Sequence, residues 1–253
     1  MSSVWSRPSP PRRPALTREA IVAAAIAIAD AEGLAAVSIR RVATELGARA
    51  MTLYSYIERK EDLLALMLDE IAAELRGDEL HGDELRGDEL RGDEPVPGDW
   101  REALLDIARR ERDLVRRHPW RMDLVATRGV AVGPHALRHV ERKLAVLARL
   151  GAGPAATWRF LAAYTDYMTG FLVREAQERA APRREGISDA ERAALAEPYV
   201  RELVERGELP HLAPLIEGGA AGAGDTFERG LRWLFDGIER ELSPERGGAG
   251  PGR

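Results

Sequence analysis

The sequence predicts an all-α protein, with an N-terminal three-helix helix-turn-helix domain followed by a larger helical domain. Apolar residues recur at the three- and four-residue spacing of amphipathic helices along much of the 253-residue chain. Glycine or proline stands where most of these segments should stop. No segment reads convincingly as a strand, so a sheet-based fold is excluded.

The N-terminal part predicts three short helices and a longer one, joined by tight turns. The first helix is expected between Thr17, whose hydroxyl can cap it, and Gly33. A pair of short helices then fits Ser38–Leu46 and Ala50–Tyr56, with Gly47 in the turn between them. A longer helix should start near Lys60.

The second half predicts further helices separated by loops. Order should resume near Asp99, with a helix that stops at Pro119 and a loop that reaches His135. Further helices are expected over 136–150, from Pro154 to about Arg179, after a cap at Ser188, and after a cap at Asp225.

The expected organisation divides the chain into successive segments. These are a disordered basic arm (1–15), the helix-turn-helix domain (16–62), a connecting helix (63–76), an acidic linker (77–97), a helical body (98–243) and a disordered tail (244–253).

The linker contains a near-repeat of five residues, "RGDELHGDELRGDELRGDE", which begins at Arg76. A five-residue step rotates about 140° around a helix, so successive leucines share no face. Each unit also carries a glycine, which disfavours a helix by about 1 kcal/mol. We expect a solvated spacer. Its Arg-Gly-Asp triplets resemble an integrin-binding motif, but the sequence shows no export signal to support that role.

Charge is distributed unevenly along the chain. The net charge is −5, yet residues 1–60 hold nine Arg or Lys and five Asp or Glu. This basic segment fits a polyanionic partner, although chance asymmetry of a solvated surface explains it equally well. There is no cysteine, and no apolar run approaches the ~20 residues that span a bilayer. We expect a cytoplasmic protein without a membrane partner.

Two short helices joined by a glycine turn can place the second helix in a DNA major groove. The stretch "LGARAMTLYSYIERKEDLL" resembles the DNA-binding domain of the TetR family of bacterial transcription regulators. The stretches "WREALLDIARRERDLVRRHPW", "YTDYMTGFLVREAQE" and "FERGLRWLFDGIE" resemble the ligand-binding and dimerisation domain of its tetracycline-repressor-type members. The resemblance implies a nucleoid-associated homodimer that binds double-stranded operator DNA and an unidentified small-molecule effector, without a cofactor or metal.

The resemblance also implies which residues contact DNA. Arg40 falls on a base-contacting position, Arg49 opens the base-reading part of the recognition helix, and Lys60 falls on a phosphate-binding position. Tyr56 replaces the usual histidine, and Ala50 is apolar where a base-reading glutamine can stand, so the operator should differ. The implied set is Thr17, Ser38, Arg40, Arg49, Ala50, Met51, Thr52, Tyr54, Tyr56 and Lys60.

Several of these residues have a structural alternative. Tyr54 and Tyr56 can instead pack the domain, and Arg41 can form a surface ion pair rather than bind phosphate. His135 and His139 have the i, i+4 spacing of a helical metal pair, but histidines beside a loop are usually just solvated, and we expect no metal site.

The helical body offers candidates for a ligand pocket and for a dimer interface. The pocket candidates are Trp120, Met122, Trp158, Tyr164, Tyr167, Met168 and Phe171. As ordinary core they need no ligand. The helix from Pro154 carries two apolar stripes and must bury both. One stripe can meet the partner subunit together with Leu231, Leu234, Phe235 and Ile238, and the other can line a cavity. The sequence leaves open which stripe does which.

The predicted function is a repressor that binds a palindromic operator as a dimer and releases it when a small molecule binds. An activator or a ligand-independent regulator remains an alternative. A helical enzyme is a remote one, because no nucleophile–base pair stands out. The ligand signal should pass between the fourth helix and the body rather than through the repeat.

Overall fold

The structure is a computed structural model that describes residues 16–75, 99–128, 132–180, 189–217 and 226–242. All regular secondary structure in these ranges is helical, which confirms the predicted all-α class. The basic arm, the acidic repeat, the tail and the caps expected at Ser188 and Asp225 lie outside the described residues.

The first helices begin where the sequence places their caps. Helix α1 (Arg18–Glu32) follows Thr17, whose Oγ1 accepts a hydrogen bond from the Ala20 N–H at 3.1 Å, and it ends at Gly33 with φ 86°. Helix α2 (Ile39–Glu45) follows Ser38, whose Oγ accepts from the Arg41 N–H at 3.1 Å. Both caps satisfy N–H groups that the first helical turn leaves unpaired.

The third helix is shorter than predicted. Helix α3 (Ala50–Leu53) was expected to reach Tyr56, but the chain turns after Leu53. The Leu53 carbonyl accepts from the N–H groups of both Tyr56 and Ile57, at 2.9 and 3.0 Å. This turn lets Leu53 and Ile57 enter the same core, where they are 0% and 2% exposed.

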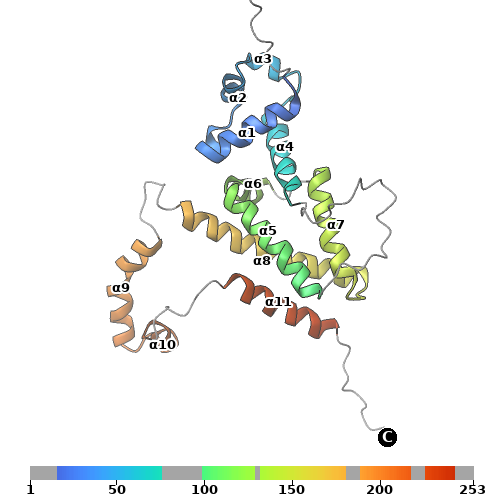
Figure 1. Cartoon of the computed structure of the whole chain (residues 1–253). Helices are drawn as coiled ribbons and strands as arrows, with labels where there is room; N and C mark the ends of the chain where they lie inside the picture. The colour runs from blue at the N-terminus through green and yellow to red at the C-terminus, as the bar shows by residue number, and fades with distance from the viewer. Residues whose placement is uncertain (1–15, 76–98, 129–131, 181–188, 218–225, 243–253) are drawn as a thin grey trace, which may run out of the picture.

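Helix α4 (Lys60–Ala73) connects the N-terminal helices to the rest of the molecule. Its buried residues Leu63, Leu64 and Met67 pack with α1 and α2 around one hydrophobic core. Figure 1 shows α4 running from this group toward the larger group of helices, where it lies beside α7.

The larger group is built around a second hydrophobic core. It comprises α5 (Trp100–Arg117), α6 (Trp120–Arg128), α7 (Pro134–Ala148), α8 (Pro154–Ala180) and α11 (Phe227–Leu242). Helix α6 was not predicted from the sequence. This helix is anchored in both cores, because Trp120 and Leu124 pack in the first and Met122 in the second.

Helices α9 (Asp189–Glu205) and α10 (Ala213–Glu217) lie apart from both groups, at the left of Figure 1. Their apolar side chains Leu195, Tyr199 and Leu215 are 61–69% exposed. Within the described ranges, no helix has the length and apolar character needed to cross a membrane.

Candidate functional site

The outer surface of α2, α3 and the following turn collects most residues predicted to contact DNA. Met51, Tyr54 and Tyr56 are 78%, 47% and 43% exposed, although apolar and aromatic side chains of this size are normally buried. Thr17, Arg40, Arg49, Thr52 and Lys60 are also exposed, whereas Ser38 and Ala50 are half-buried. The exposed positions surround Leu53, which anchors α3 in the core.

The cationic groups of this surface differ in whether they are already paired. The side chains of Arg40, Arg49 and Lys60 make no hydrogen bond or ion pair with any described residue. Arg41, in contrast, pairs with Glu32 at 2.6 Å and with Glu45 at 2.8 Å. Thus Arg41 takes the surface ion-pair role, and the unpaired cations are available to phosphate or base edges.

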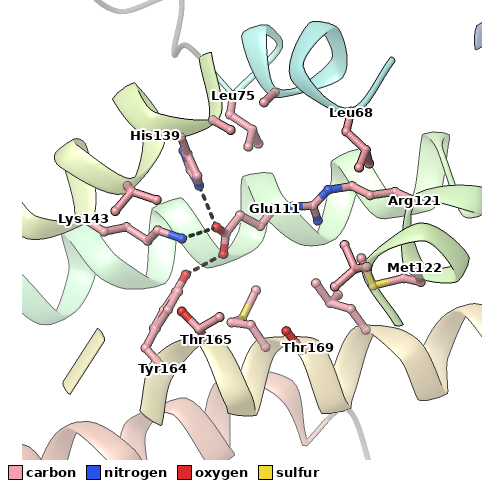
Figure 2. Close-up of a pocket in the computed structure, with 16 residues that line it drawn as sticks. Leu68, Leu75, Glu111, Arg121, Met122, His139, Lys143, Tyr164, Thr165 and Thr169 are labelled. Atoms are coloured by element: carbon pink, nitrogen blue, oxygen red, sulfur yellow. Dashed lines mark hydrogen bonds and ion pairs between the residues drawn. The ribbon is translucent and has the colours of Figure 1, made fainter. Parts of the chain in front are cut away.

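A cavity of about 80 Å³ lies between α4, α5, α6, α7 and α8 (Figure 2). Helix α4 contributes Leu68 and Ala72 to its wall, and Leu75 follows just after the helix. The same helix packs in the N-terminal core. Helix α4 therefore both lines the cavity and supports the DNA-facing helices.

A buried polar network occupies one side of this cavity. Glu111 on α5 is 5% exposed, and its Oε1 lies 2.9 Å from Lys143 Nζ and 2.6 Å from His139 Nε2, both on α7. Its Oε2 accepts a hydrogen bond from the Tyr164 hydroxyl on α8 at 2.9 Å. Figure 2 shows these groups converging on the carboxylate. The network therefore ties α5, α7 and α8 together.

The network fixes the protonation of its members. Burial raises the pKa of Glu111, but the Lys143 ammonium and the His139 hydrogen bond outweigh it, so the pKa of Glu111 lies well below its ordinary value. Burial lowers the pKa of His139 despite the neighbouring carboxylate. Burial and the Glu111 charge raise the pKa of Tyr164 well above 10.0. Glu111 is thus an anion that accepts hydrogen bonds from a neutral imidazole and a neutral phenol.

Arg121 on α6 lies across the cavity from Lys143, and its guanidinium points toward the interior in Figure 2. Burial lowers the pKa of this guanidinium, although an arginine remains charged. Among the described residues, none accepts a hydrogen bond from it. The oxygens of Glu111 are already engaged by His139, Lys143 and Tyr164.

The structure brings together only part of the predicted ligand pocket. Met122, Tyr164 and Met168 line the cavity. Four candidates lie elsewhere: Trp120, Trp158, Tyr167 and Phe171. These four residues do not line this cavity, because each has another environment in the fold.

Their environments explain the difference. Trp120 packs in the N-terminal core. Tyr167 donates a hydrogen bond to the Phe227 carbonyl at 2.8 Å and fills the space over Gly230, where a Cβ would lie 2.3 Å from the Tyr167 hydroxyl. The Phe171 ring packs at a tilt against the Phe227 ring, with centroids 4.9 Å apart, and Trp158 is 68% exposed.

The residues predicted for the dimer interface pack against other helices of the same chain. Leu231, Phe235 and Ile238 are 0%, 0% and 4% exposed within a single chain, where they pack in the second core, and Leu234 is half-buried against it. Their spacing showed an apolar face, but that face meets α5 and α8 of its own chain. The outward face of α11 instead carries Trp233, which is 67% exposed.

Polar contacts join the N-terminal helices to the body at the end of α5. Asp30 Oδ1 on α1 accepts a hydrogen bond from Trp120 Nε1 at 2.6 Å and lies 2.8 Å from His118 Nδ1. The other imidazole nitrogen lies 3.0 Å from Glu74 Oε1, beyond the end of α4. His118 thus bridges carboxylates from two N-terminal segments.

A second joint connects α4 to α7. Asp69 is 8% exposed, and its Oδ1 accepts from the N–H groups of His135 and Ala136 at the start of α7, both at 2.9 Å. Arg142 Nη1 donates to the Leu75 carbonyl at 2.7 Å. Two sets of hydrogen bonds thus connect α4 and the residues just after it to α7. His135 and His139 do not form a metal pair here, since His139 bonds to Glu111, and no cluster of metal-ligating side chains occurs in the described ranges.

Sequence reasoning missed Glu111, Lys143 and Arg121. A signal was present for Glu111, because it occupies the apolar stripe that Leu104, Ala108 and Val115 define on α5. Lys143 lies likewise on the buried face of α7, with Ala136 and Leu147. A charged residue in an apolar stripe predicts a buried polar network. Arg121 had no comparable signal, because α6 itself was not expected.

Residues 94–242 match the model of a tetracyclin repressor-like C-terminal domain. The chain belongs to the TetR family of transcription regulators. It is 34% identical over 245 residues to the HTH-type transcriptional repressor DrrR1 of Streptomyces coeruleorubidus, covering 97% of this chain and 85% of that protein. It is 31% identical over 238 residues to an HTH-type transcriptional regulator of Saccharopolyspora erythraea, covering 93% and 91%.

Solved structures share the fold. Apo ActR from Streptomyces coelicolor has a TM-score of 0.70 at 25% identity, covering 91% of this chain and 100% of ActR. ActR in complex with actinorhodin has a TM-score of 0.68 at 23% identity, covering 90% and 98%. BioQ with its double-stranded DNA operator has a TM-score of 0.57 at 21% identity, covering 89% and 99%.

Family membership confirms the predicted class of function. The TetR regulator described here is a DNA-binding transcription regulator and not an enzyme. Its individual DNA-contacting residues remain predictions. Most of them are exposed, and the side chains of Arg40, Arg49 and Lys60 make no ion pair with any described residue.

Proposed function

We propose that this TetR regulator is a homodimeric repressor that occupies a palindromic operator and releases it when a small molecule enters the cavity. The observation that carries this proposal is the position of α4. Leu63, Leu64 and Met67 hold it to the DNA-facing helices, while Leu68, Ala72 and Leu75 line the cavity. A molecule in the cavity therefore touches the helix that supports the recognition surface.

The size of the cavity favours a conformational response. Its volume of about 80 Å³ holds water-sized groups, whereas pockets for drug-sized ligands measure roughly 300–1,000 Å³. A ligand of that size must push the lining helices apart. Because α4 is fastened to α7 through Asp69 and Arg142, any separation of α7 from α5 or α8 also moves α4. A shift of α4 changes the spacing of two recognition helices, which must lie about 34 Å apart on DNA.

The dimer is proposed to form through the outward faces of α8 and α11. These helices lie side by side, with Arg159 and Glu241 paired at 2.8 Å. Their outward faces carry Trp158 and Trp233, and a Cβ added at Gly170 or Gly237 would meet nothing within 4 Å. Large exposed aromatic residues beside open glycine positions allow close approach of a second copy.

The relatives support a repressor that responds to a ligand. DrrR1 carries the name of a transcriptional repressor, ActR has been solved with actinorhodin, and BioQ with its operator. A regulator of this kind acts in the cytoplasm, at the nucleoid.

The proposal is tested with the DNA upstream of the protein's own gene. Fluorescence anisotropy should show salt-dependent binding of one dimer per palindromic site, and compounds that raise the melting temperature of the free protein should weaken that binding. Ala72→Phe, which places a larger side chain in the cavity, should abolish the compounds' effect on both measurements. Tight DNA binding that no stabilising compound weakens would favour a ligand-independent regulator.

A further inference from the structure

The described residues that line the cavity include two cations, Arg121 and Lys143, and one anion, Glu111. Glu111 and Lys143 neutralise one another at 2.9 Å, and His139 is neutral because burial lowers its pKa. Arg121 remains, with its guanidinium in the cavity and no hydrogen-bond acceptor among the described residues. The described lining residues therefore carry one more positive charge than negative charges.

The Glu111 charge raises the pKa of Arg121 against the effect of burial, but the Glu111 oxygens accept no hydrogen bond from Arg121. Glu111 Oε1 accepts hydrogen bonds from His139 and Lys143, and Oε2 accepts one from the Tyr164 hydroxyl. Turning the carboxylate toward Arg121 would leave the Lys143 ammonium buried without its counter-ion, at a cost typical of a broken buried ion pair. Among the described residues, Glu111 is the one carboxylate that lines the cavity, and its network keeps it from forming hydrogen bonds with Arg121.

A guanidinium in such a place favours a specific kind of ligand group. Arginine presents a planar fork of N–H donors that matches a carboxylate with two parallel hydrogen bonds. A buried charge without a partner is unfavourable. The attraction between an entering anion and Arg121 is also stronger in the cavity than it would be in bulk water.

The rest of the wall is mainly apolar. Leu68 and Met122 lie near Arg121 in Figure 2, and Met168 and Leu172 of α8 also line the cavity. Methionine side chains adapt to flat or irregular apolar surfaces. The combination suits an apolar body that ends in an anion rather than a sugar, a peptide or a cation.

We propose that the effector of this regulator is a mainly apolar organic acid whose carboxylate pairs with Arg121. This inference rests on the proposed function in that it uses the same cavity, and it adds the chemical class of the ligand. Arg121 is then the specificity-determining residue, and the Glu111 network is the device that keeps Arg121 available.

The test uses two probes of nearly equal size, the anion 2-naphthoate and the neutral amide 2-naphthamide, measured by calorimetry on the full chain. We expect 2-naphthoate to bind at least about tenfold more tightly than the amide. In Arg121→Met and in Arg121→Gln this ratio should fall to about one. Arg138→Met is the matched control, because Arg138 is an exposed arginine of α7 outside the cavity wall, and it should keep the wild-type ratio.

A further variant separates this inference from the proposed function. Thr165→Phe fills the cavity and should abolish binding of both probes. Equal affinities for acid and amide in the wild type, both lost in Thr165→Phe, would retain the ligand cavity and overturn the acid assignment. Binding of neither probe, or binding that persists in Thr165→Phe, would overturn both. A preference for the acid that survives in folded Arg121→Met and Arg121→Gln would remove Arg121 from the recognition of the ligand.

Discussion

The carboxylate of Glu111 on α5 lies 2.9 Å from the ammonium of Lys143 on α7, and the two residues are 5% and 7% exposed. An ion pair this deep is costly to form, because both ions lose their hydration. It is also costly to break, because the remaining charge stays buried. The pair therefore holds α5 and α7 in one arrangement beside the cavity.

Removing one partner should destabilise the regulator strongly. Lys143→Met leaves Glu111 with hydrogen bonds but without its counter-ion, and we expect a loss of about 3–5 kcal/mol in the free energy of unfolding. The double variant Glu111→Leu/Lys143→Met should recover much of that loss. Urea unfolding of both single variants and the double variant measures the coupling. Additive losses in this cycle would show that the pair contributes no specific interaction.

The same network predicts how stability changes with pH. The pKa of His139 is lowered in the folded protein, so below about 6.5, the ordinary histidine value, the unfolded chain binds a proton that the folded chain does not. The pKa of Glu111 is also lowered, and the stability it provides is lost as the pH falls below about 4.5. Stability should therefore decrease from pH 7.5 to 5.5 and decrease further below 4.5.

Unfolding at these pH values in His139→Gln tests the histidine contribution. The glutamine amide can still donate to Glu111 but does not titrate, so the decrease between pH 7.5 and 5.5 should become smaller. His211→Gln is the control, because His211 is exposed on the segment before α10. An unchanged pH profile in His139→Gln would assign the acid sensitivity to other groups.

The proposed dimer interface predicts different effects for substitutions at two nearby residues of α11, Trp233 and Phe235. Trp233→Arg places a charge on the outward face and should yield a folded monomer in sedimentation velocity, with unchanged helix content by circular dichroism. Phe235→Ala removes a fully buried ring and should cost about 3–5 kcal/mol of stability through the protomer core instead. An intact dimer in both Trp233→Arg and Trp158→Arg would move the interface to another surface, such as the exposed apolar residues of α9.

These residues show where sequence reasoning succeeded and where it stopped. The caps at Thr17 and Ser38 were predictable because a cap is a local interaction between a side chain and the next turn. The spacing of Leu231, Phe235 and Ile238 predicted a buried face, and they are buried. Periodicity predicts that a face is covered but does not show whether its own chain or a partner covers it, and here helices of the same chain cover this face of α11.

The cavity was less predictable for a related reason. Tyr164 and Met168 were among the expected lining residues, but a pocket depends on helices that meet from distant parts of the sequence. Trp120 was assigned to it by composition, whereas the structure places Trp120 against Asp30 on α1. The expectation that the fourth helix connects to the body has a physical basis in the contacts of Asp69 and Arg142.

DNA binding should distinguish paired from unpaired cations of the N-terminal surface. Lys60→Ala should weaken binding to all sequences and lower the slope of log affinity against log salt by about one. Arg40→Ala should cost about 1–3 kcal/mol and relax the preference at one base pair. Arg41→Ala is the matched control, because its guanidinium is held by Glu32 and Glu45 and should contribute little to the salt slope. Equal effects of Lys60→Ala and Arg41→Ala would refute the phosphate assignment.

The last prediction concerns the joint between α1 and the start of α6. Asp30 accepts a 2.6 Å hydrogen bond from the Trp120 indole and lies 2.8 Å from His118, so it holds the N-terminal helices against the body. Trp120→Phe removes the indole N–H but keeps an aromatic ring in the core. A hydrogen bond to a charged acceptor contributes roughly 1.5–3 kcal/mol, and its loss should loosen α1 more than helix α8.

Hydrogen exchange followed by mass spectrometry can locate that effect. In Trp120→Phe, amides in the last turn of α1 and in α4 should exchange faster, while those of α8 should keep their protection. Asp30→Asn should act in the same direction, and the double variant should add little, because both changes break the same contact. Arg41→Ala again serves as a control, since it breaks ion pairs among the N-terminal residues only. Faster exchange spread evenly over α1, α4 and α8 would mean that the joint supports global stability and does not separately control the position of the DNA-binding helices.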